Sequence, residues 1–447
     1  MTEKKTKLNL FDFTMIVVSL VIGMGIFRTP ANVAHAVPSP FMFFFVWLAG
    51  GLVALCGALT YAEIGSRLPV TGAYYKIFSY CYHPSVAFAV NCIILVSNAA
   101  SLAGVALIGA EYITKVIMPD AQNVQTIQII IAILSILVFY GVNLLGLRMS
   151  AKTQSVLTII KISMILLLIF PLFFVSGGQD LAPEIIQSDT TISAYLKAFG
   201  IGLVAVSFTY GGYQQTINFG GDVSRPNRNI PLGIFIGIFV IIALYLTINY
   251  AYVKVIGFNE LKNAKGIAAI MASHVFGDAA GRILSVLLFL SVLAYVNVLL
   301  MSNPRVMYAM SEDRVLPRAF GEKNPRTNVL TTSLSVFAVI CVLIVFFAKE
   351  FDEILSFTIF LDCIGMAFSA ATIFILRKRT PVQEGDPEIY KMKLYPLLPL
   401  IFISAYIFVA ISIAIDSPNT ALTATGVLAV FLVIYFVTTY LTKKKLQ

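Results

Sequence analysis

Long stretches without a single charged residue dominate this chain. Each is long enough to cross a bilayer as a helix, which needs about 20 mostly apolar residues. Of the 447 residues, 59% are hydrophobic and only 12% are charged, and the mean hydropathy is +0.89. This composition excludes a water-soluble globular domain. The charge-free runs cover residues 29–62, 84–110, 121–147, 198–221, 229–253, 283–304, 327–348, 394–415 and 417–442.

Shorter or charge-interrupted segments complete a set of twelve predicted spans, so the chain is expected to be an all-α integral membrane protein. We expect the first segment to be a retained span, because it lacks a short hydrophobic core followed by a small-residue cleavage site. Little sequence remains for anything else, which indicates a single domain over residues 1–447. The predicted spans are 12–37, 40–63, 84–114, 121–147, 151–175, 194–219, 229–256, 279–305, 327–348, 351–376, 394–415 and 419–442.

The basic residues are distributed unevenly between the two sides of the predicted membrane. The chain has 31 Lys and Arg against 22 Asp and Glu, a net charge of +9. With a cytoplasmic amino terminus, 22 of the basic residues lie on the cytoplasmic side, 8 lie on the opposite side, and Lys161 lies within a span. This asymmetry follows the positive-inside rule and places both termini in the cytoplasm. The positive charge is therefore a topology signal that requires no nucleic-acid partner, and it suits a bacterial inner membrane.

Metal-binding and catalytic patterns are missing from the sequence. The five cysteines have no paired spacing, and the three histidines are scattered, so we expect no disulfide framework, metal or other cofactor. An enzyme within the membrane would need a convergent nucleophile, base or metal site, and the sequence has no HExxH motif, histidine cluster or Asp pair. No phosphate-binding loop indicates ATP as an energy source. The cysteines are Cys56, Cys81, Cys92, Cys341 and Cys363.

Two predicted spans carry a pair of glycines near the middle, Gly23-Met24-Gly25 in the first and Gly211-Gly212 in the sixth. They are five spans apart, so they cross in opposite directions, as an inverted repeat requires. Where a helix unwinds in the membrane, its freed N–H and C=O groups need other partners, and a bound solute can supply them. The amino terminus of a half-helix attracts a carboxylate, and freed carbonyls accept hydrogen bonds from an ammonium group. Close helix packing is the alternative role for such glycines.

Several motifs in the same order resemble the amino acid–polyamine–organocation (APC) transporter superfamily, and especially its L-type amino-acid transporter branch. The resemblance covers most of the chain. The residues that carry it are Gly23-Met24-Gly25-Ile26-Phe27 with Pro30, Tyr61-Ala62-Glu63 with Pro69, Thr71-Gly72-Ala73-Tyr74, Asn143, Gly146, Gln154, Lys161, Phe208-Thr209-Tyr210-Gly211-Gly212-Tyr213, Asp222, Arg225-Pro226-Asn227-Arg228-Asn229-Ile230-Pro231, Ser291, Asn297, Arg305-Val306-Met307-Tyr308, Glu312-Asp313 and Leu316-Pro317.

The resemblance implies a LeuT-like fold that moves amino acids by alternating access. Two inverted repeats of five helices (residues 11–175 and 194–376) would be followed by two accessory helices (394–442), with helices 1 and 6 unwound at mid-membrane. Phe208 would cover the substrate as a gate, and the side-chain pocket would fall to the third, sixth, eighth and tenth spans. By the same resemblance, the substrate carboxylate meets N–H groups of Gly23, Met24 and Gly25, and the amino group meets carbonyls of Val21, Phe208 and Gly211.

The sequence departs from the family pattern at several positions. Met24 stands where a Ser or Thr is usual, so a hydroxyl contact to the carboxylate is missing. Tyr213 replaces the usual Trp, and the acidic pair after the sixth span is reduced to Asp222. The loop between the third and fourth spans lacks the cysteine through which animal relatives join a partner. We therefore expect no disulfide-linked heavy chain, and a monomer or weak homo-oligomer.

Ionisable residues inside predicted spans are candidate functional groups because their desolvation is costly. The resemblance places Lys161, with Ser291, at the position of a sodium ion in sodium-driven relatives. A structural strut or a snorkelling side chain is the alternative for Lys161. Asp362 has several candidate roles: it could pair with Lys161, contact a substrate ammonium, carry a proton, or be satisfied by neighbouring hydroxyls. Glu63 lies one turn before Arg67, which predicts a local ion pair.

These residues together predict a secondary transporter of neutral L-amino acids, alanine- or serine-like or larger and apolar, working as an exchanger or proton symporter. A neutral substrate is preferred because the core of the predicted pocket is apolar and aromatic. A cationic amino-acid or polyamine transporter is the alternative, through Asp362. A transport-inactive amino-acid receptor of the same fold is the alternative from another class.

Overall fold

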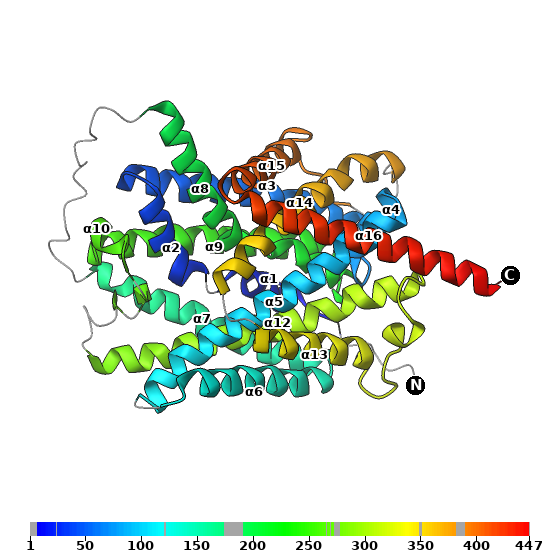
Figure 1. Cartoon of the computed structure of the whole chain (residues 1–447), viewed down its shortest axis with the longest axis horizontal. Coiled ribbons are helices and arrows are strands. Elements are labelled where there is room, and N and C mark those ends of the chain that lie inside the picture. The colour runs from blue at the N-terminus through cyan, green and yellow to red at the C-terminus, as the bar shows by residue number, and fades with distance from the viewer. Residues whose placement is uncertain are drawn as a thin grey trace.

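The computed structural model describes residues 7–23, 25–119, 122–173, 191–264, 266–268, 270–271, 278–347, 351–380 and 389–446. Over these residues the chain is a bundle of long helices, most of which run along the longest axis of the molecule (Figure 1). The helices are α1 Leu10–Val21, α2 Gly25–Ala36, α3 Pro40–Arg67, α4 Ala73–Cys81, α5 Pro84–Ile117, α6 Val124–Leu144, α7 Leu147–Ile169, α8 Ile192–Tyr210, α9 Pro226–Val255, α10 Phe258–Leu261, α12 Asp278–Glu312, α13 Thr331–Phe347, α14 Phe351–Arg379, α15 Leu397–Asp416 and α16 Pro418–Leu446.

Local capping explains where several helices begin. Asn9 accepts a hydrogen bond from the N–H of Asp12 at 2.8 Å and opens α1. Ser39 opens α3 in the same way, and Pro40 follows it in the first turn, where its missing N–H removes no helical bond. Short 3-10 turns, η2 Tyr213–Asn218 and η3 Gly220–Asp222, connect α8 to α9.

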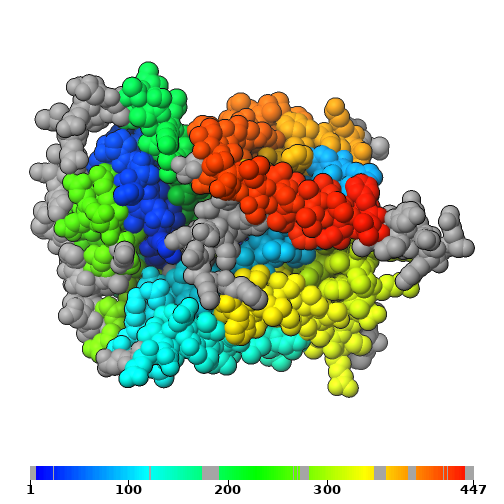
Figure 2. Space-filling view, viewed as in Figure 1, coloured from blue at the N-terminus to red at the C-terminus, as the bar shows by residue number. Residues whose placement is uncertain are grey.

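Ten of the described helical segments are long and apolar enough to cross a membrane, and they coincide with ten of the predicted spans. Shorter apolar helices, Thr331–Phe346 and Ala421–Val437, lie at the ninth and twelfth predicted positions. The outer surface is apolar in keeping with this: α16, red in Figure 2, exposes Val430, Val433 and Phe436. Such a surface is unfavourable in water and matches lipid. The chain is thus a multi-pass membrane protein.

Loops that the charge pattern assigns to one side of the membrane meet at one end of the molecule. The N–H of Leu8 donates to the carbonyl of Asp222 at 2.8 Å, and the Asp222 carboxylate pairs with Arg305 at 2.7 Å. Asp313, which follows Arg305 closely in the sequence, pairs with Lys76 at 2.7 Å. Segments from the amino terminus and from three loops are therefore bound together.

The core is arranged around the two interrupted spans. The first span is split into α1 and α2, and the sixth ends as a regular helix at Tyr210. Helix α1 packs against α7 and α9, whereas α2 packs against α8. The helix pairs α3 with α9 and α5 with α12 surround them. Both glycine pairs singled out in the sequence thus lie where a helix is broken.

Candidate functional site

The break in the first span is a tight turn of a defined type. Ile22 has φ −73° and ψ 86°, and the N–H of Gly23 donates to the carbonyl of Val21 at 2.8 Å. This i to i+2 bond is an inverse γ-turn, which interrupts the helix after α1 within the same span. Helix α2 then begins at Gly25, whose N–H is one of the first-turn donors that have no acceptor within a helix.

The break in the sixth span lies against the first one at van der Waals distance. Gly212 has φ +109°, and a Cβ atom there would lie 2.3 Å from the carbonyl oxygen of Leu20. A Cβ on Gly25 would lie 2.8 Å from the Thr209 hydroxyl. Glycine is required at 212 for both reasons, its backbone conformation and the closeness of the neighbouring chain.

Side chains from other helices bind the freed carbonyl groups. The Tyr245 hydroxyl of α9 lies 3.3 Å from the carbonyl oxygens of both Val21 and Thr209, one from each interrupted span. Lys161 of α7 is fully buried, and its Nζ donates to the carbonyl of Ile22 and lies 3.5 Å from the Ser19 hydroxyl. The broken backbone is therefore held from two sides by a phenol and an ammonium group.

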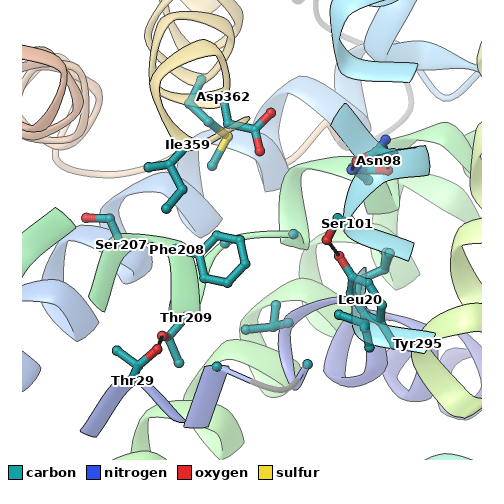
Figure 3. Close-up of a pocket in the computed structure, with 18 of the residues that line it drawn as sticks. Leu20, Thr29, Asn98, Ser101, Ser207, Phe208, Thr209, Tyr295, Ile359 and Asp362 are labelled. Atoms are coloured by element: carbon teal, nitrogen blue, oxygen red, sulfur yellow. Dashed lines mark hydrogen bonds between the residues drawn. The ribbon is translucent and has the colours of Figure 1, made fainter. Parts of the chain in front are cut away.

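The two breaks border a cavity of about 110 Å³, which is several times the roughly 10–15 Å³ that one water molecule needs. Residues of α1, α2, α5, α8, α12, α14 and α15 line it. Phe208 projects its ring into the cavity, with Ile359 of α14 on the same side (Figure 3). Thr209 donates to Thr29 at 2.9 Å and links α8 to α2 at the cavity wall. The cavity thus combines an aromatic wall with exposed backbone groups.

The wall formed by α5 and α12 is polar. Ser101 and the Tyr295 hydroxyl are 2.9 Å apart, and Asn98 exchanges hydrogen bonds with Gln215 at 3.2 and 2.7 Å (Figure 3 shows Ser101, Tyr295 and Asn98). Asp362 of α14 also lines the cavity and accepts a hydrogen bond at 3.2 Å from Ser97 of α5, the residue before Asn98. A solute inside would meet hydroxyl, amide and carboxyl groups on one side and Phe208 on the other.

The comparisons with known proteins agree with this geometry. A family model described as amino acid permease matches residues 8–439. The chain belongs to this family. The permease is 28% identical to the serine/threonine exchanger SteT of Bacillus subtilis, over 91% of this chain and 90% of that protein. It is 26% identical to the human cystine/glutamate transporter over 97% of this chain and 86% of the relative. The permease is 24% identical to the human large neutral amino acids transporter small subunit 2, over 97% of this chain and 81% of that protein.

The family and its relatives establish the general activity. The resemblance to the APC superfamily and its L-type branch is confirmed, and the permease is an amino acid transporter and not an enzyme. Amino acids are its substrates in the general sense that the family shares. This accounts for a cavity that lies between membrane helices and has polar groups on one wall and an aromatic ring on the other.

The structure brings together most of the candidate substrate residues. The cavity is lined by Val21, Gly23, Gly25, Phe208, Gly211 and Asp362. Met24 lies outside the described residues. Lys161 and Ser291, both buried, do not line the cavity as described; Lys161 lies behind the turn at Ile22. Lys161 and Asp362 do not pair within the described structure, because Lys161 bonds α1 while Asp362 accepts from Ser97 of α5 at 3.2 Å.

Some groups facing the predicted backbone site are already bonded. The N–H of Gly23 donates within the γ-turn, and the carbonyl of Phe208 accepts from Gly211 at 3.2 Å. Two contributors were missed from the sequence, the Tyr245 hydroxyl and the Asn98–Gln215 pair. Tyr245 lies in a charge-free run, where nothing distinguishes it from a packing residue. Asn98 and Gln215 are polar residues within spans, a signal that could have singled them out.

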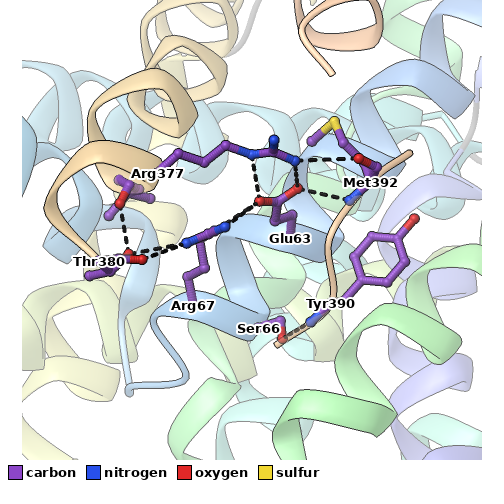
Figure 4. A network of polar contacts seen from close by, with 8 residues as sticks. Glu63, Ser66, Arg67, Arg377, Thr380, Tyr390 and Met392 are labelled. Carbon is purple, nitrogen blue, oxygen red and sulfur yellow. Dashed lines mark hydrogen bonds and ion pairs between the residues drawn. The ribbon is translucent and has the colours of Figure 1, made fainter. Parts of the chain in front are cut away.

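A second polar cluster lies at the end of α3, away from the cavity (Figure 4). The predicted ion pair of Glu63 with Arg67 is present at 2.8 Å. Glu63 also binds Arg377 of α14 through two bonds of 2.8 and 2.7 Å, and the N–H of Met392 at 2.9 Å. Glu63 has no exposed side-chain surface. Beside it, burial and the negative charge of Glu63 raise the pKa of Tyr390, so that the phenol stays neutral.

Proposed function

We propose that this permease carries small neutral L-amino acids across the membrane by alternating access. The observation that carries the proposal is the meeting of two interrupted helices at one enclosed cavity, with α2 starting there and freed carbonyls beside it. An amino acid has both complementary groups, since its carboxylate suits the start of a helix and its ammonium suits carbonyl oxygens. The serine/threonine exchanger among the relatives favours a small substrate and an exchange mode.

In this proposal the backbone of the breaks binds the part that all amino acids share. The carboxylate meets the N–H groups of Gly23, Met24 and Gly25, and the γ-turn at Ile22 opens to free the N–H of Gly23. The ammonium meets the carbonyls of Val21, Phe208 and Gly211. The Phe208 carbonyl accepts one bond from Gly211 and can accept a second, and the same opening of the γ-turn frees one of the two acceptor positions that Gly23 and Tyr245 occupy on Val21. Phe208 is the gate, because its ring already projects into the cavity.

The LeuT-like arrangement belongs to the same proposal. The two breaks are five spans apart, as two inverted repeats of five helices require. In this arrangement α13 and α16 complete twelve spans as the ninth and twelfth, residues 11–175 and 194–376 form the repeats, and α15 and α16 are accessory. The whole chain acts as one domain.

Lys161 and Ser291 are proposed to replace a sodium ion. An ammonium that donates to the Ile22 carbonyl supplies the positive charge that a bound sodium would bring to the turn. This role supports either an exchanger or a proton symporter, depending on whether Lys161 stays charged through the cycle.

We also propose the orientation and the assembly. The end of the molecule where Leu8, Asp222 and Arg305 meet is rich in Lys and Arg, which favours the cytoplasmic side of a bacterial inner membrane. All five cysteines lie within helices, and four are buried, which favours a permease without a disulfide-linked companion. We therefore propose that the permease is a monomer or a weak homo-oligomer.

Cationic amino acids and polyamines are the second candidate substrates, because the carboxylate of Asp362 lies in the cavity. Uptake competition separates the two. If ornithine, arginine and putrescine compete while alanine, serine and leucine do not, the neutral assignment fails.

The deciding experiment is uptake of radiolabelled alanine into proteoliposomes that contain the purified permease. Uptake that requires unlabelled amino acid inside identifies an exchanger. Accumulation in empty vesicles under an inward proton gradient identifies a symporter. Saturable binding without uptake in any arrangement would contradict the transport proposal and identify a receptor.

A further inference from the structure

Asp362 has far fewer partners than a carboxylate in a membrane protein needs. Its Oδ1 accepts from the Ser97 hydroxyl at 3.2 Å, and no other described residue donates to it or pairs with it. A carboxylate offers about four lone-pair positions, so most of its accepting capacity is unused. Asp362 is half-buried, so its unused acceptor positions are available to whatever occupies the cavity.

The free side of this carboxylate faces the cavity. Asp362 lies on α14, one turn before Met366, and both residues line the cavity. The polar side chains of the neighbouring wall bond one another: Ser101 bonds Tyr295, and Asn98 bonds Gln215. These neighbours therefore leave Asp362 as the acceptor that a solute would meet first.

The basic residues of this region have interactions of their own: Arg28, which lines the same cavity, is one of them, and Lys161 is the other. Lys161 donates to the Ile22 carbonyl on the far side of the turn, and it forms no ion pair with Asp362 in the described structure. The negative charge of Asp362 is therefore not balanced by a contact ion pair. A solute with a hydrogen-bond donor would complete it, and an apolar solute would leave it unsatisfied.

We propose that Asp362 forms a side-chain subsite that selects amino acids whose side chain carries a hydrogen-bond donor, a hydroxyl or an ammonium group. This inference rests on the proposed amino acid site and refines it: the backbone at the two breaks holds the shared part of the substrate, and Asp362 reads the side chain. Ser97 is the positioning residue, because it donates to Oδ1 and leaves Oδ2 without a donor among the described residues.

The test compares substrates that match in shape and differ in one donor. Threonine and valine differ by a hydroxyl in place of a methyl group, and ornithine and 2-aminopentanoic acid differ mainly by the terminal ammonium. Each is measured as an inhibitor of alanine exchange in proteoliposomes and by its effect on the melting of the solubilised wild-type protein. We expect the donor-bearing member of at least one pair to bind about tenfold more tightly or better. Equal affinities in both pairs would overturn the subsite, and this result needs no variant.

Two substitutions identify which donor is selected. Asp362→Asn removes the charge but keeps an acceptor, so it abolishes a preference for ammonium and retains much of a preference for hydroxyl. Asp362→Leu removes the acceptor, so the affinity ratios of both pairs, threonine to valine and ornithine to 2-aminopentanoic acid, should fall close to one. The control is Glu111→Gln, which removes a carboxylate from the same membrane-embedded protein at an exposed ion pair with Lys115, outside the cavity lining. It should leave both ratios unchanged.

Other outcomes contradict the inference in distinguishable ways. If Asp362→Leu keeps the wild-type ratios, another group reads the side chain. If the ratios stay constant while the pH dependence of exchange shifts in Asp362→Asn, the carboxyl carries a proton and not a substrate contact. If the wild type exchanges alanine but shows flat ratios, only the subsite fails. If it transports no amino acid, by exchange or under a proton gradient, the proposed function itself fails.

Discussion

Two carboxylates within the helix bundle lie in opposite surroundings in this permease. Glu63, at the end of α3, accepts bonds from two arginines and a backbone N–H, and has no exposed side-chain surface. Asp362, in α14, has the single described donor Ser97 and borders the cavity. The protein's own donors fill the acceptor positions of Glu63, whereas most acceptor positions of Asp362 have no donor among the described residues. The contrast separates an acidic group that holds helices together from one that is available to a ligand.

The same contrast extends to the surrounding backbone. Around Glu63, segments far apart in sequence are fastened together, since Arg67 also donates to the carbonyl of Thr380 at 2.8 Å. Around the cavity, the interrupted spans expose backbone groups, and Tyr245 and Lys161 satisfy some of them. An alternating-access transporter needs both kinds of region, one that fixes helices and one whose groups can change partners.

The largest effect is expected from Glu63→Gln. The amide keeps the shape, but it cannot balance Arg67 and Arg377, and its NH₂ group faces other donors. Breaking a buried charge network of this kind costs about 3–5 kcal/mol, which would show as a large fall in the melting temperature of the solubilised protein. Glu111→Gln is the matched control, because its ion pair with Lys115 is exposed and contributes about 0–1 kcal/mol. Equal melting of the two variants would show that burial does not distinguish these carboxylates.

Gly212→Ala should have the next largest effect, this time at the cavity. Alanine at φ +109° is strained, and its Cβ would lie 2.3 Å from the Leu20 carbonyl oxygen. Backbone strain and overpacking together predict a loss of about 2–4 kcal/mol, with loss of transport. Gly141→Ala is the control, since a Cβ there meets nothing within 4 Å and alanine favours a helix. Normal transport by Gly212→Ala would mean that the two breaks do not need to touch.

The sequence predicts the helices well but places side chains poorly. Charge-free runs indicate spans because the membrane imposes length and apolarity on them, and the glycine pairs indicate both breaks for the same physical reason. The Glu63–Arg67 pair is a local spacing of four residues, so it was visible. Arg377, which binds the same carboxylate from 314 residues away, was not, because no local pattern encodes that contact.

Asp362 shows a different limit. One carboxyl in an apolar run does not reveal which face of the helix turns inward, so several roles stayed open. The structure brings it to the cavity and to Ser97, and leaves Lys161 elsewhere. Lys161 was identified from its cost in the membrane, yet its acceptor, the carbonyl of Ile22, exists only because the chain forms a γ-turn there.

Lys161→Ala tests whether the break in the first span still functions when the Ile22 carbonyl loses its side-chain donor. It removes the donor to the Ile22 carbonyl, and a buried acceptor without a partner costs about 1–3 kcal/mol. We expect alanine exchange to fall about tenfold or more and its pH dependence to change. Lys152→Ala, on the exposed face of the same helix, should behave as wild type. Wild-type exchange and pH dependence in Lys161→Ala would refute the coupling role.

Tyr245→Phe should give the smallest change and the finest test of the cavity region. The hydroxyl has one proton to share between Val21 and Thr209, each at 3.3 Å, so its removal should cost only about 1 kcal/mol. Tyr140→Phe is the control: it removes a 2.8 Å bond to Ser335 and does not involve the cavity lining. Both variants should melt slightly lower, but only Tyr245→Phe should change the half-saturating alanine concentration, by a few fold. If neither variant changes the half-saturating concentration, the link from α9 to both breaks contributes to packing and not to substrate affinity. The γ-turn and Lys161 would then be enough to hold the first span in its binding conformation.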